Sequence, residues 1–118
     1  MLADEVVGAT QSPIEAMMAR ALLDLGLRVT PQRFVLNGDS HLLVDLAVTI
    51  GRRRIAIECD GYEYHHTRDQ IARDRKRERI LQAKGWTVIR FSGSEIHRDP
   101  RACAREVLSI ARAHGGTP

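Results

Sequence analysis

The sequence has few cysteines and no long apolar run. Cys59 and Cys103 lie far apart and form no CxxC pair, which argues against a disulfide scaffold or a cysteine zinc ribbon and leads us to expect a reducing compartment. The apolar runs are only a few residues long, far short of the roughly 20 residues that cross a bilayer, so we expect no membrane span. The first ten residues also lack the early positive charges of a signal peptide.

Lysine is scarce as well. Arginine makes up 16 of the 18 basic residues, and the net charge of +3 permits nucleic-acid binding without establishing it. A chain of 118 residues, 43% of them hydrophobic, is long enough to bury one core. We therefore expect a single domain over residues 12–114, with a loose arm over residues 1–11 and a short tail over residues 115–118.

Apolar spacing and turn signals predict the element order helix, three strands, helix, strand, helix. Ser12 and Pro13 begin the first helix, and Gly26 ends it. Asn37-Gly38 predicts a hairpin turn, and Pro31 indicates either an edge strand or a bulge in the strand before it. The other predicted elements are strands over residues 28–36, 43–50, 54–60 and 86–91, and helices over residues 68–84 and 100–113. This pattern is typical of a mixed sheet with helices, in the α/β or α+β class.

Acidic residues meet in the hairpin predicted for the second and third strands. With Gly51-Arg52 as a two-residue turn, Asp45 faces Glu58, and with a four-residue turn it faces Asp60. In both registers two carboxylates lie opposite the aliphatic stripe, with Cβ atoms ~4.5–5.5 Å apart. Such a pair shares a proton or a cation, and hard oxygen ligands favour Mg²⁺ or Mn²⁺. The alternative is that these acids face solvent on the polar side of the hairpin.

Two further acids lie on predicted helices, and each also has a structural explanation. Glu15 stands three residues after Ser12, as in a capping box, but it also lies at the flank of the apolar stripe and faces the sheet edge. Asp74 falls among the core-facing positions of its helix. It either pairs with a buried arginine such as Arg90 or contributes to the site.

The loop after the third strand carries two histidines. His65 and His66 are either part of an exposed loop or provide a proton-transfer group near pH 7 or a metal ligand. The HExxH and Cys/His spacings of zinc sites are absent. Tyr62 and Tyr64 either pack or stack on bases.

The helix predicted after this loop has a strongly basic face. Residues 68–79 contain six basic and three acidic residues. Such a face is either simply solvated or, together with the arginines at the hairpin tip, contacts phosphates. The candidate DNA-contacting residues are Arg52, Arg53, Arg54, Arg73, Lys76 and Arg77.

Five ordered stretches cover most of residues 12–113: SPIEAMMARAL, VDLAV, IAIECDGYEYHH, RDRKRERILQAKGWTVIRF and DPRACAREV. Together they resemble the very-short-patch-repair-endonuclease-like domains of the PD-(D/E)XK nuclease superfamily. The resemblance implies a restriction-endonuclease-like αβββαβ core with an additional C-terminal helix. It also implies a metal-dependent phosphodiesterase site and action on DNA in the cytoplasm.

The resemblance assigns roles by position. It makes Asp45 and Glu58 the ligands of Mg²⁺ or Mn²⁺, and Glu15 the supporting acid on the first helix. Asp60 is then a further site residue, and His65 matches the histidine that this branch places after the strand.

Asp74 matches the acid of the second helix. One position departs from the wider superfamily, which commonly has lysine two residues after the second acid, where this chain has Asp60. The branch that the chain resembles uses histidine instead.

We therefore expect a DNA endonuclease that depends on Mg²⁺ or Mn²⁺. The missing lysine and the small charge excess favour an alternative, a non-catalytic nucleic-acid-binding or interaction module on the same scaffold. A zinc-bound structural domain is a third hypothesis. The sequence leaves open whether the domain works alone or together with a fused or partner domain.

Overall fold

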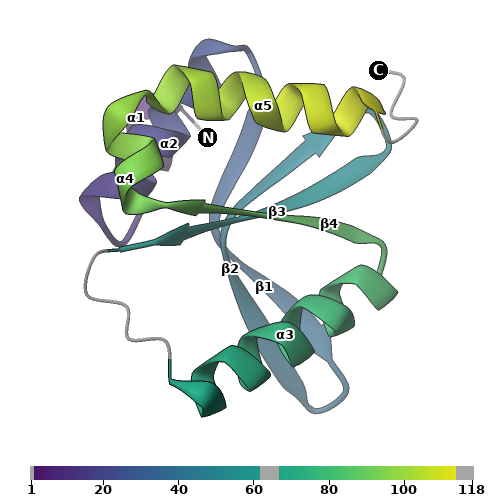
Figure 1. Cartoon of the computed structure of the whole chain (residues 1–118). Coiled ribbons are helices and arrows are strands. Elements are labelled where there is room, and N and C mark those ends of the chain that lie inside the picture. The colour runs from purple at the N-terminus through teal and green to yellow at the C-terminus, as the bar shows by residue number, and fades with distance from the viewer. Residues whose placement is uncertain (1, 62–66, 114–118) are drawn as a thin grey trace.

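Within the described residues, four strands form one mixed sheet (Figure 1). The computed structural model describes residues 2–61 and 67–113. The first three strands pair antiparallel in chain order, and the fourth lies parallel to the third at the sheet edge. The strands are β1 (Arg28–Asn37), β2 (Ser40–Ile50), β3 (Arg53–Asp60) and β4 (Trp86–Ser92).

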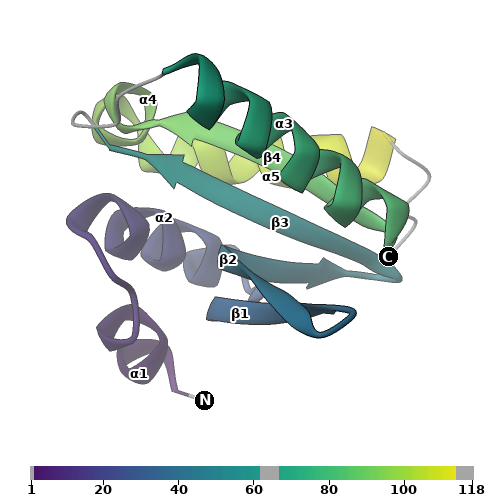
Figure 2. The same ribbon diagram turned by 90° about the horizontal axis from the view of Figure 1, so that it is seen from below.

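Helices cover both faces of the sheet, as Figures 1 and 2 show. One face packs against α1, α2, α4 and α5, and the other packs against α3. The order α2-β1-β2-β3-α3-β4 is the predicted αβββαβ core, and α5 is the predicted additional helix. The helices are α1 (Ala3–Gly8), α2 (Pro13–Asp24), α3 (Arg68–Ala83), α4 (Gly93–Arg98) and α5 (Pro100–Ala113).

Each face of the sheet has its own apolar core. Ile55 and Ile57 of β3 point into the larger core beneath α2 and α5, whereas Ala56 lies in the smaller core beneath α3 with Leu81 and Trp86. This alternation is the predicted one. Each fully buried aliphatic side chain of this kind contributes about 1.5–3 kcal/mol to folding.

Side-chain caps and glycines set the helix ends as the sequence predicts. Ser12 Oγ accepts a hydrogen bond from the Glu15 N–H, and Asp99 Oδ1 accepts one from the Ala102 N–H. Gly85 follows α3 with φ +89°, a conformation that suits glycine. None of the helices in the described ranges has the length and the apolar composition to cross a bilayer.

The two hairpins differ in how well their turns were predicted. Ile50 pairs with Arg53, which confirms Gly51-Arg52 as a two-residue turn. In the first hairpin Asn37 pairs with Ser40, so the turn residues are Gly38-Asp39 and the predicted Asn37-Gly38 was wrong by one residue. Both turns place glycine first, at φ +62° and +60°, as type II′ hairpin turns require.

Partway along the β1–β2 hairpin, the alternation of side chains between the two faces of the sheet is interrupted. We expected Val44 on the same face as Leu46, but Val44 lies in the core beneath α3 and Leu46 lies in the larger core. The interruption occurs at Asp45, across from Gln32, whose φ of +50° is sparsely populated for residues other than glycine. The regular alternation of both strands breaks at this point, and Asp45 lies at the break.

The N-terminal residues are more ordered than expected. In place of a loose arm they contain α1, whose Val6 is 2% exposed and belongs to the larger core. A six-residue helix with one buried position is too short to give a periodic signal.

Because Val6 fills the core, Val6→Ala should lower the free energy of unfolding by about 1–3 kcal/mol. Glu5→Ala, on the exposed side of the same helix, should change it by less than about 0.5 kcal/mol. Urea denaturation measures both values. Equal stability of the two variants would show that α1 does not dock on the core.

Candidate active site

Among the described residues, four carboxylates converge on Cys59 near the carboxyl end of β3. Burial raises the pKa of the Cys59 thiol far above its usual range, and the negative charges of Asp45, Glu15, Glu58 and Asp60 raise it further. The thiol therefore stays protonated and supplies neither a nucleophile nor a soft metal ligand. The chemistry available at this end of the sheet is that of oxygen ligands.

Asp45 lies where β2 and β3 separate. The regular pairing of these strands ends at Leu46 and Ile57, one pair before the predicted meeting of Asp45 with Glu58. Beyond it, the Cys59 N–H donates to Asp45 Oδ2 at 3.0 Å. Because the strand alternation breaks at Asp45, the Cys59 N–H donates to the Asp45 side chain instead of to a backbone carbonyl of β2.

Asp45 and Glu58 nevertheless remain in direct contact. Glu58 is 6% exposed, and burial raises its pKa to about 7. The positive charge of Arg77 opposes this rise, whereas the charge of Asp45 and a hydrogen bond between the two carboxyl groups add to it. Two carboxylates held this close repel each other when both are ionised, and either a proton or a cation relieves that repulsion.

Arg77 is the cation closest to this pair in the described ranges. We expected it on the outer side of α3 among the DNA contacts, but its side chain is only 21% exposed. Its guanidinium group donates to Glu58 Oε1 and to the Leu43 carbonyl oxygen. The β1–β2 hairpin lies along the flank of α3 and covers this side of the helix, which the position of Arg77 on the helix alone did not reveal. Arg77 is therefore a charge partner of Glu58.

Glu15 combines both functions that the sequence left open. Its carboxylate accepts from the Gln11 N–H and from the Ser12 hydroxyl, each at 3.2 Å, so it closes the start of α2. It also accepts from Gln32 Nε2 of β1 at 2.6 Å and is 7% exposed. Burial raises the pKa of Glu15, and the charge of Asp45 adds to this effect. Glu15 thus closes the helix and also faces the acidic pair.

Asp60 and Asp74 belong to a neighbouring network around Arg90. This arginine contacts Asp60 at 3.5 Å, Asp74 at 3.2 Å and Glu78 at 3.0 Å. The predicted pairing of Asp74 with Arg90 is confirmed. Arg90 lies beside Glu58 in the parallel register of β3 and β4, so the network fixes α3 against the carboxyl end of β3.

A cavity of about 450 Å³ opens beside Glu15. Glu15, Cys59 and Gly61 line it together with His97 of α4, a residue that we did not select from the sequence. A Cβ atom at Gly93 would lie 3.2 Å from the Asp60 carbonyl oxygen, so glycine lets α4 approach the end of β3. The sequence did contain a signal for α4, the capping box formed by Ser92 and Glu95.

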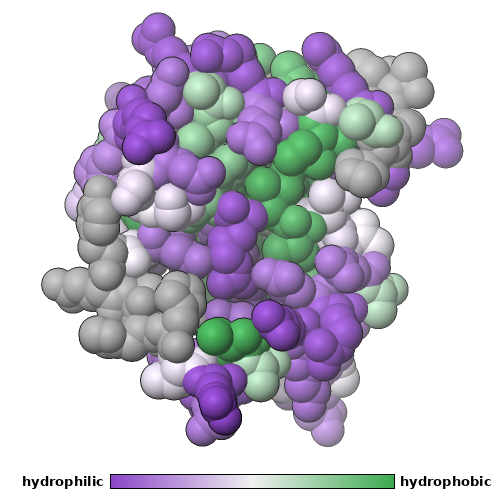
Figure 3. Space-filling model, in the orientation of Figure 1, coloured by the Kyte–Doolittle hydropathy of each residue, from purple (hydrophilic) through white to green (hydrophobic). Residues whose placement is uncertain are grey.

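The remaining predicted residues are spread over the molecule. Arg52, Arg53 and Arg54 lie at the far end of β3, at the turn. Arg73 and Lys76 are exposed on α3, where Figure 3 shows a mostly hydrophilic surface. The predicted loop residues His65, His66, Tyr62 and Tyr64 lie outside the described residues.

The donor set at the acidic pair fits a hard divalent cation. In residues 2–61 and 67–113, no group of three or more His, Cys, Asp or Glu side chains is arranged to hold a metal ion. Mg²⁺, however, commonly uses one or two carboxylates and keeps several waters. Asp45 and Glu58 meet that requirement, and their mutual repulsion favours a bound cation.

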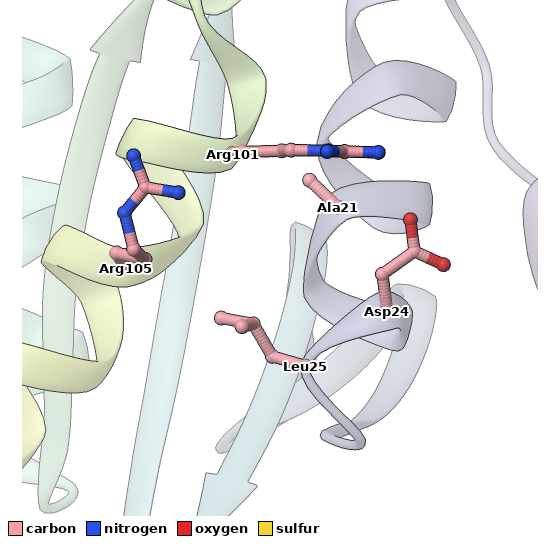
Figure 4. A pocket seen from close by; sticks show the side chains of 5 residues that line it. All are labelled: Ala21, Asp24, Leu25, Arg101 and Arg105. Carbon is pink, nitrogen blue, oxygen red and sulfur yellow. The ribbon is translucent and has the colours of Figure 1, made fainter.

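A second cleft lies between the end of α2 and the start of α5 (Figure 4). Ala21, Asp24 and Leu25 line one side, and Arg101 and Arg105 line the other. Glu15 lies in the first turn of α2, so this cleft is separate from the acidic pair.

A mixed sheet with an acidic pair at the end of two central strands is typical of restriction-endonuclease-like proteins. The family REase_MTES_1575, a restriction-endonuclease-like family, matches residues 14–110. The chain belongs to this family, which supports its place in the PD-(D/E)XK superfamily and a nuclease function.

Curated relatives add no stated activity. The chain is similar to the uncharacterized protein MT2308 of Mycobacterium tuberculosis strain CDC 1551 / Oshkosh and to the uncharacterized protein Rv2248 of strain ATCC 25618 / H37Rv. Each is 25% identical over 107 residues, 90% of this chain and 40% of the relative. The chain therefore spans less than half the length of these relatives. No solved structure matches it significantly.

The raised pKa of Glu58 predicts a pH-dependent stability. Folding raises this pKa from its ordinary value of 4.5 to about 7, so the folded protein binds the extra proton between these values. The contribution of Glu58 to the free energy of unfolding should therefore fall as pH rises from about 4.5 to about 7. Over this pH range the wild type should lose up to about 3 kcal/mol of unfolding free energy relative to Glu58→Gln, because each unit of pKa shift corresponds to about 1.4 kcal/mol.

Urea denaturation in a chelating buffer at several pH values measures this difference. Glu106→Gln, on the exposed surface of α5, serves as the control and should follow the wild-type curve. A difference between wild type and Glu58→Gln that stays constant over this range would contradict the assignment.

Proposed function

We propose that the protein is a cytoplasmic DNA endonuclease that uses Mg²⁺ or Mn²⁺, from the very-short-patch-repair-like branch of its superfamily. The observation that carries the proposal is the contact between the carboxyl groups of Asp45 and Glu58 at the end of the β2–β3 pairing. Membership of a restriction-endonuclease-like family supports the same reaction class.

Asp45 and Glu58 would hold the cation, with the Cys59 carbonyl as a further oxygen ligand. A divalent ion bound there polarises the scissile phosphate and lowers the pKa of water. Asp45 is held in place by the Cys59 amide, so its free oxygen is oriented before any ligand binds. Glu15 adds negative charge from α2 and is itself fixed by Gln32.

Arg77 supplies a positive charge beside Glu58. Its guanidinium group holds Glu58 from α3, and its contact with Leu43 ties the helix to β2. It lowers the pKa of Glu58 against the effect of burial, so it favours the ionised carboxylate that a cation needs.

A histidine would carry the proton. His65 is the candidate implied by the resemblance, either taking a proton from water or giving one to the leaving oxygen. His97 lines the cavity beside Glu15 and Cys59 and is a second candidate. Positioned acid–base groups of this kind typically contribute about 10²–10⁴-fold to the rate.

The exposed bases of α3 would hold the DNA backbone. Arg73 and Lys76 point away from the core and would contact phosphates without reading sequence.

One observation favours the non-catalytic alternative. Arg77 already neutralises Glu58, so a module that only binds nucleic acid would need no cation at this place. Such a module would keep the fold and the basic face of α3 but would not bind a divalent ion at Asp45 and Glu58.

Wild-type protein should nick supercoiled plasmid when Mg²⁺ or Mn²⁺ is present. Asp45→Asn and Glu58→Gln should each reduce the rate by at least about 10²-fold, because each removes a charged ligand of the ion. Agarose gels measure the nicked product over time. Asp39→Asn, in the exposed turn of the first hairpin, is the matched control and should cut normally. Activity that survives both site variants or a chelator would refute the proposal.

A thermal melt separates the nuclease from the non-catalytic module. A cation that binds only the folded protein at about 100 times its Kd stabilises it by about 2.7 kcal/mol. Millimolar Mn²⁺ should therefore raise the Tm of wild type and of Asp39→Asn, but not that of Asp45→Asn. An unchanged wild-type Tm, together with salt-sensitive DNA binding, would favour the module.

A further inference from the structure

A basic cavity lies between the β1–β2 hairpin and the end of α3, away from the acidic pair. Its lining includes Arg33, Arg54 and Lys84, together with Trp86 and the exposed ring of Phe34. None of its lining residues in the described ranges is acidic. Only Arg54 was among the DNA contacts that we predicted from the sequence.

The indole ring of Trp86 organises this cluster. The guanidinium carbon of Arg54 lies 5.0 Å from the ring centroid, and that of Arg33 lies 5.9 Å from it. Cation–π attraction holds both groups over the same ring. Arg54 also donates to the Lys84 carbonyl oxygen at 2.6 Å, which ties the end of α3 to β3.

The charges in this cavity are not compensated. Within residues 2–61 and 67–113, no ion pair involves Arg33, Arg54 or Lys84, whereas Arg77 and Arg90 each contact carboxylates. Three cations that lie together without counter-charges repel one another, and an anionic ligand relieves this repulsion. Arg33 and Arg54 are exposed, so an extended polyanion reaches them more readily than an enclosed small anion would.

The cavity lies at the opposite end of β3 from the acidic pair. Arg54, Ala56 and Glu58 point to the same face of β3 because side chains alternate along a strand. Ala56 is buried beneath α3, so α3 separates the cavity from the acidic pair on this face, and the cavity is a binding surface distinct from the acidic site.

We propose that Arg33, Arg54 and Lys84 bind backbone phosphates of DNA at a surface away from the acidic pair. Trp86 holds the guanidinium groups in place, and the exposed ring of Phe34 contacts the sugar or base. The inference rests on the proposed function for the identity of the ligand. It concerns binding rather than cleavage, so it is tested without a divalent ion.

Fluorescence anisotropy of a fluorescein-labelled DNA duplex, in a chelating buffer at several salt concentrations, tests these contacts. Arg33→Gln combined with Lys84→Gln should weaken binding and make the slope of log K against log salt shallower by about 2, because each lost phosphate contact removes about 0.9. Arg54 is left intact because its hydrogen bond to the Lys84 carbonyl oxygen also holds the end of α3 against β3. The matched control, Arg28→Gln with Arg112→Gln, makes the same charge change at exposed residues outside the cavity.

Trp86 provides a second readout because it is the only tryptophan in the chain. Binding of DNA beside Arg33 and Arg54 should change its emission, and the change should saturate at the same Kd that anisotropy gives. Arg33→Lys combined with Lys84→Arg keeps both charges and should retain the wild-type salt dependence.

The outcomes separate this inference from the proposed nuclease activity. Weaker binding and a shallower slope in the glutamine variant, but not in the control, support the phosphate contacts even if no DNA is cut. Equal affinity and slope in both variants would overturn the inference even if the wild type nicks plasmid. Absence of DNA binding by the wild type, or unchanged Trp86 emission in saturated complexes, would overturn it as well.

Discussion

The desolvated contact between Asp45 and Glu58 is the constraint around which the rest of this molecule is arranged. Glu58 is buried and Asp45 half-buried; burial raises the pKa of Glu58 to about 7, and the charge of Asp45 adds to this rise while that of Arg77 opposes it. The Cys59 amide fixes one of them and Arg77 neutralises the other. A fold that tolerates this cost gains a place where a cation or a proton binds strongly.

The surrounding elements hold this contact from three sides. β2 and β3 separate at Asp45 because the alternation of the first hairpin is interrupted there, and Gln32 at that point also anchors Glu15. On the other side of the sheet, Arg77 and Arg90 tie α3 to the end of β3. The charged groups near the pair thus form two linked sets: Glu15 with Asp45 and Glu58, and the arginines that hold α3 against the end of β3.

Much of the fold could be predicted because its signals are local. Caps, glycine stops and strand alternation predicted α2, α3 and α5, and they narrowed the β2–β3 hairpin to two registers, of which the structure has the one that brings Asp45 near Glu58. The interruption of the alternation at Asp45 could not be predicted, because it depends on how the whole hairpin twists over two cores. Nor could the inward turn of Arg77, since a helical wheel does not show that β2 covers the flank of α3. The six-residue helix α4, and with it His97, had a capping signal but no periodicity.

The central claim is that a divalent ion binds between Asp45 and Glu58, and paramagnetic broadening by Mn²⁺ in NMR spectra tests it most directly. On this account, substoichiometric Mn²⁺ broadens the amide resonances of residues 45, 58 and 59 before any others, and Asp45→Asn abolishes this effect. Broadening that centres elsewhere in the protein, or that persists unchanged in Asp45→Asn, would contradict the account.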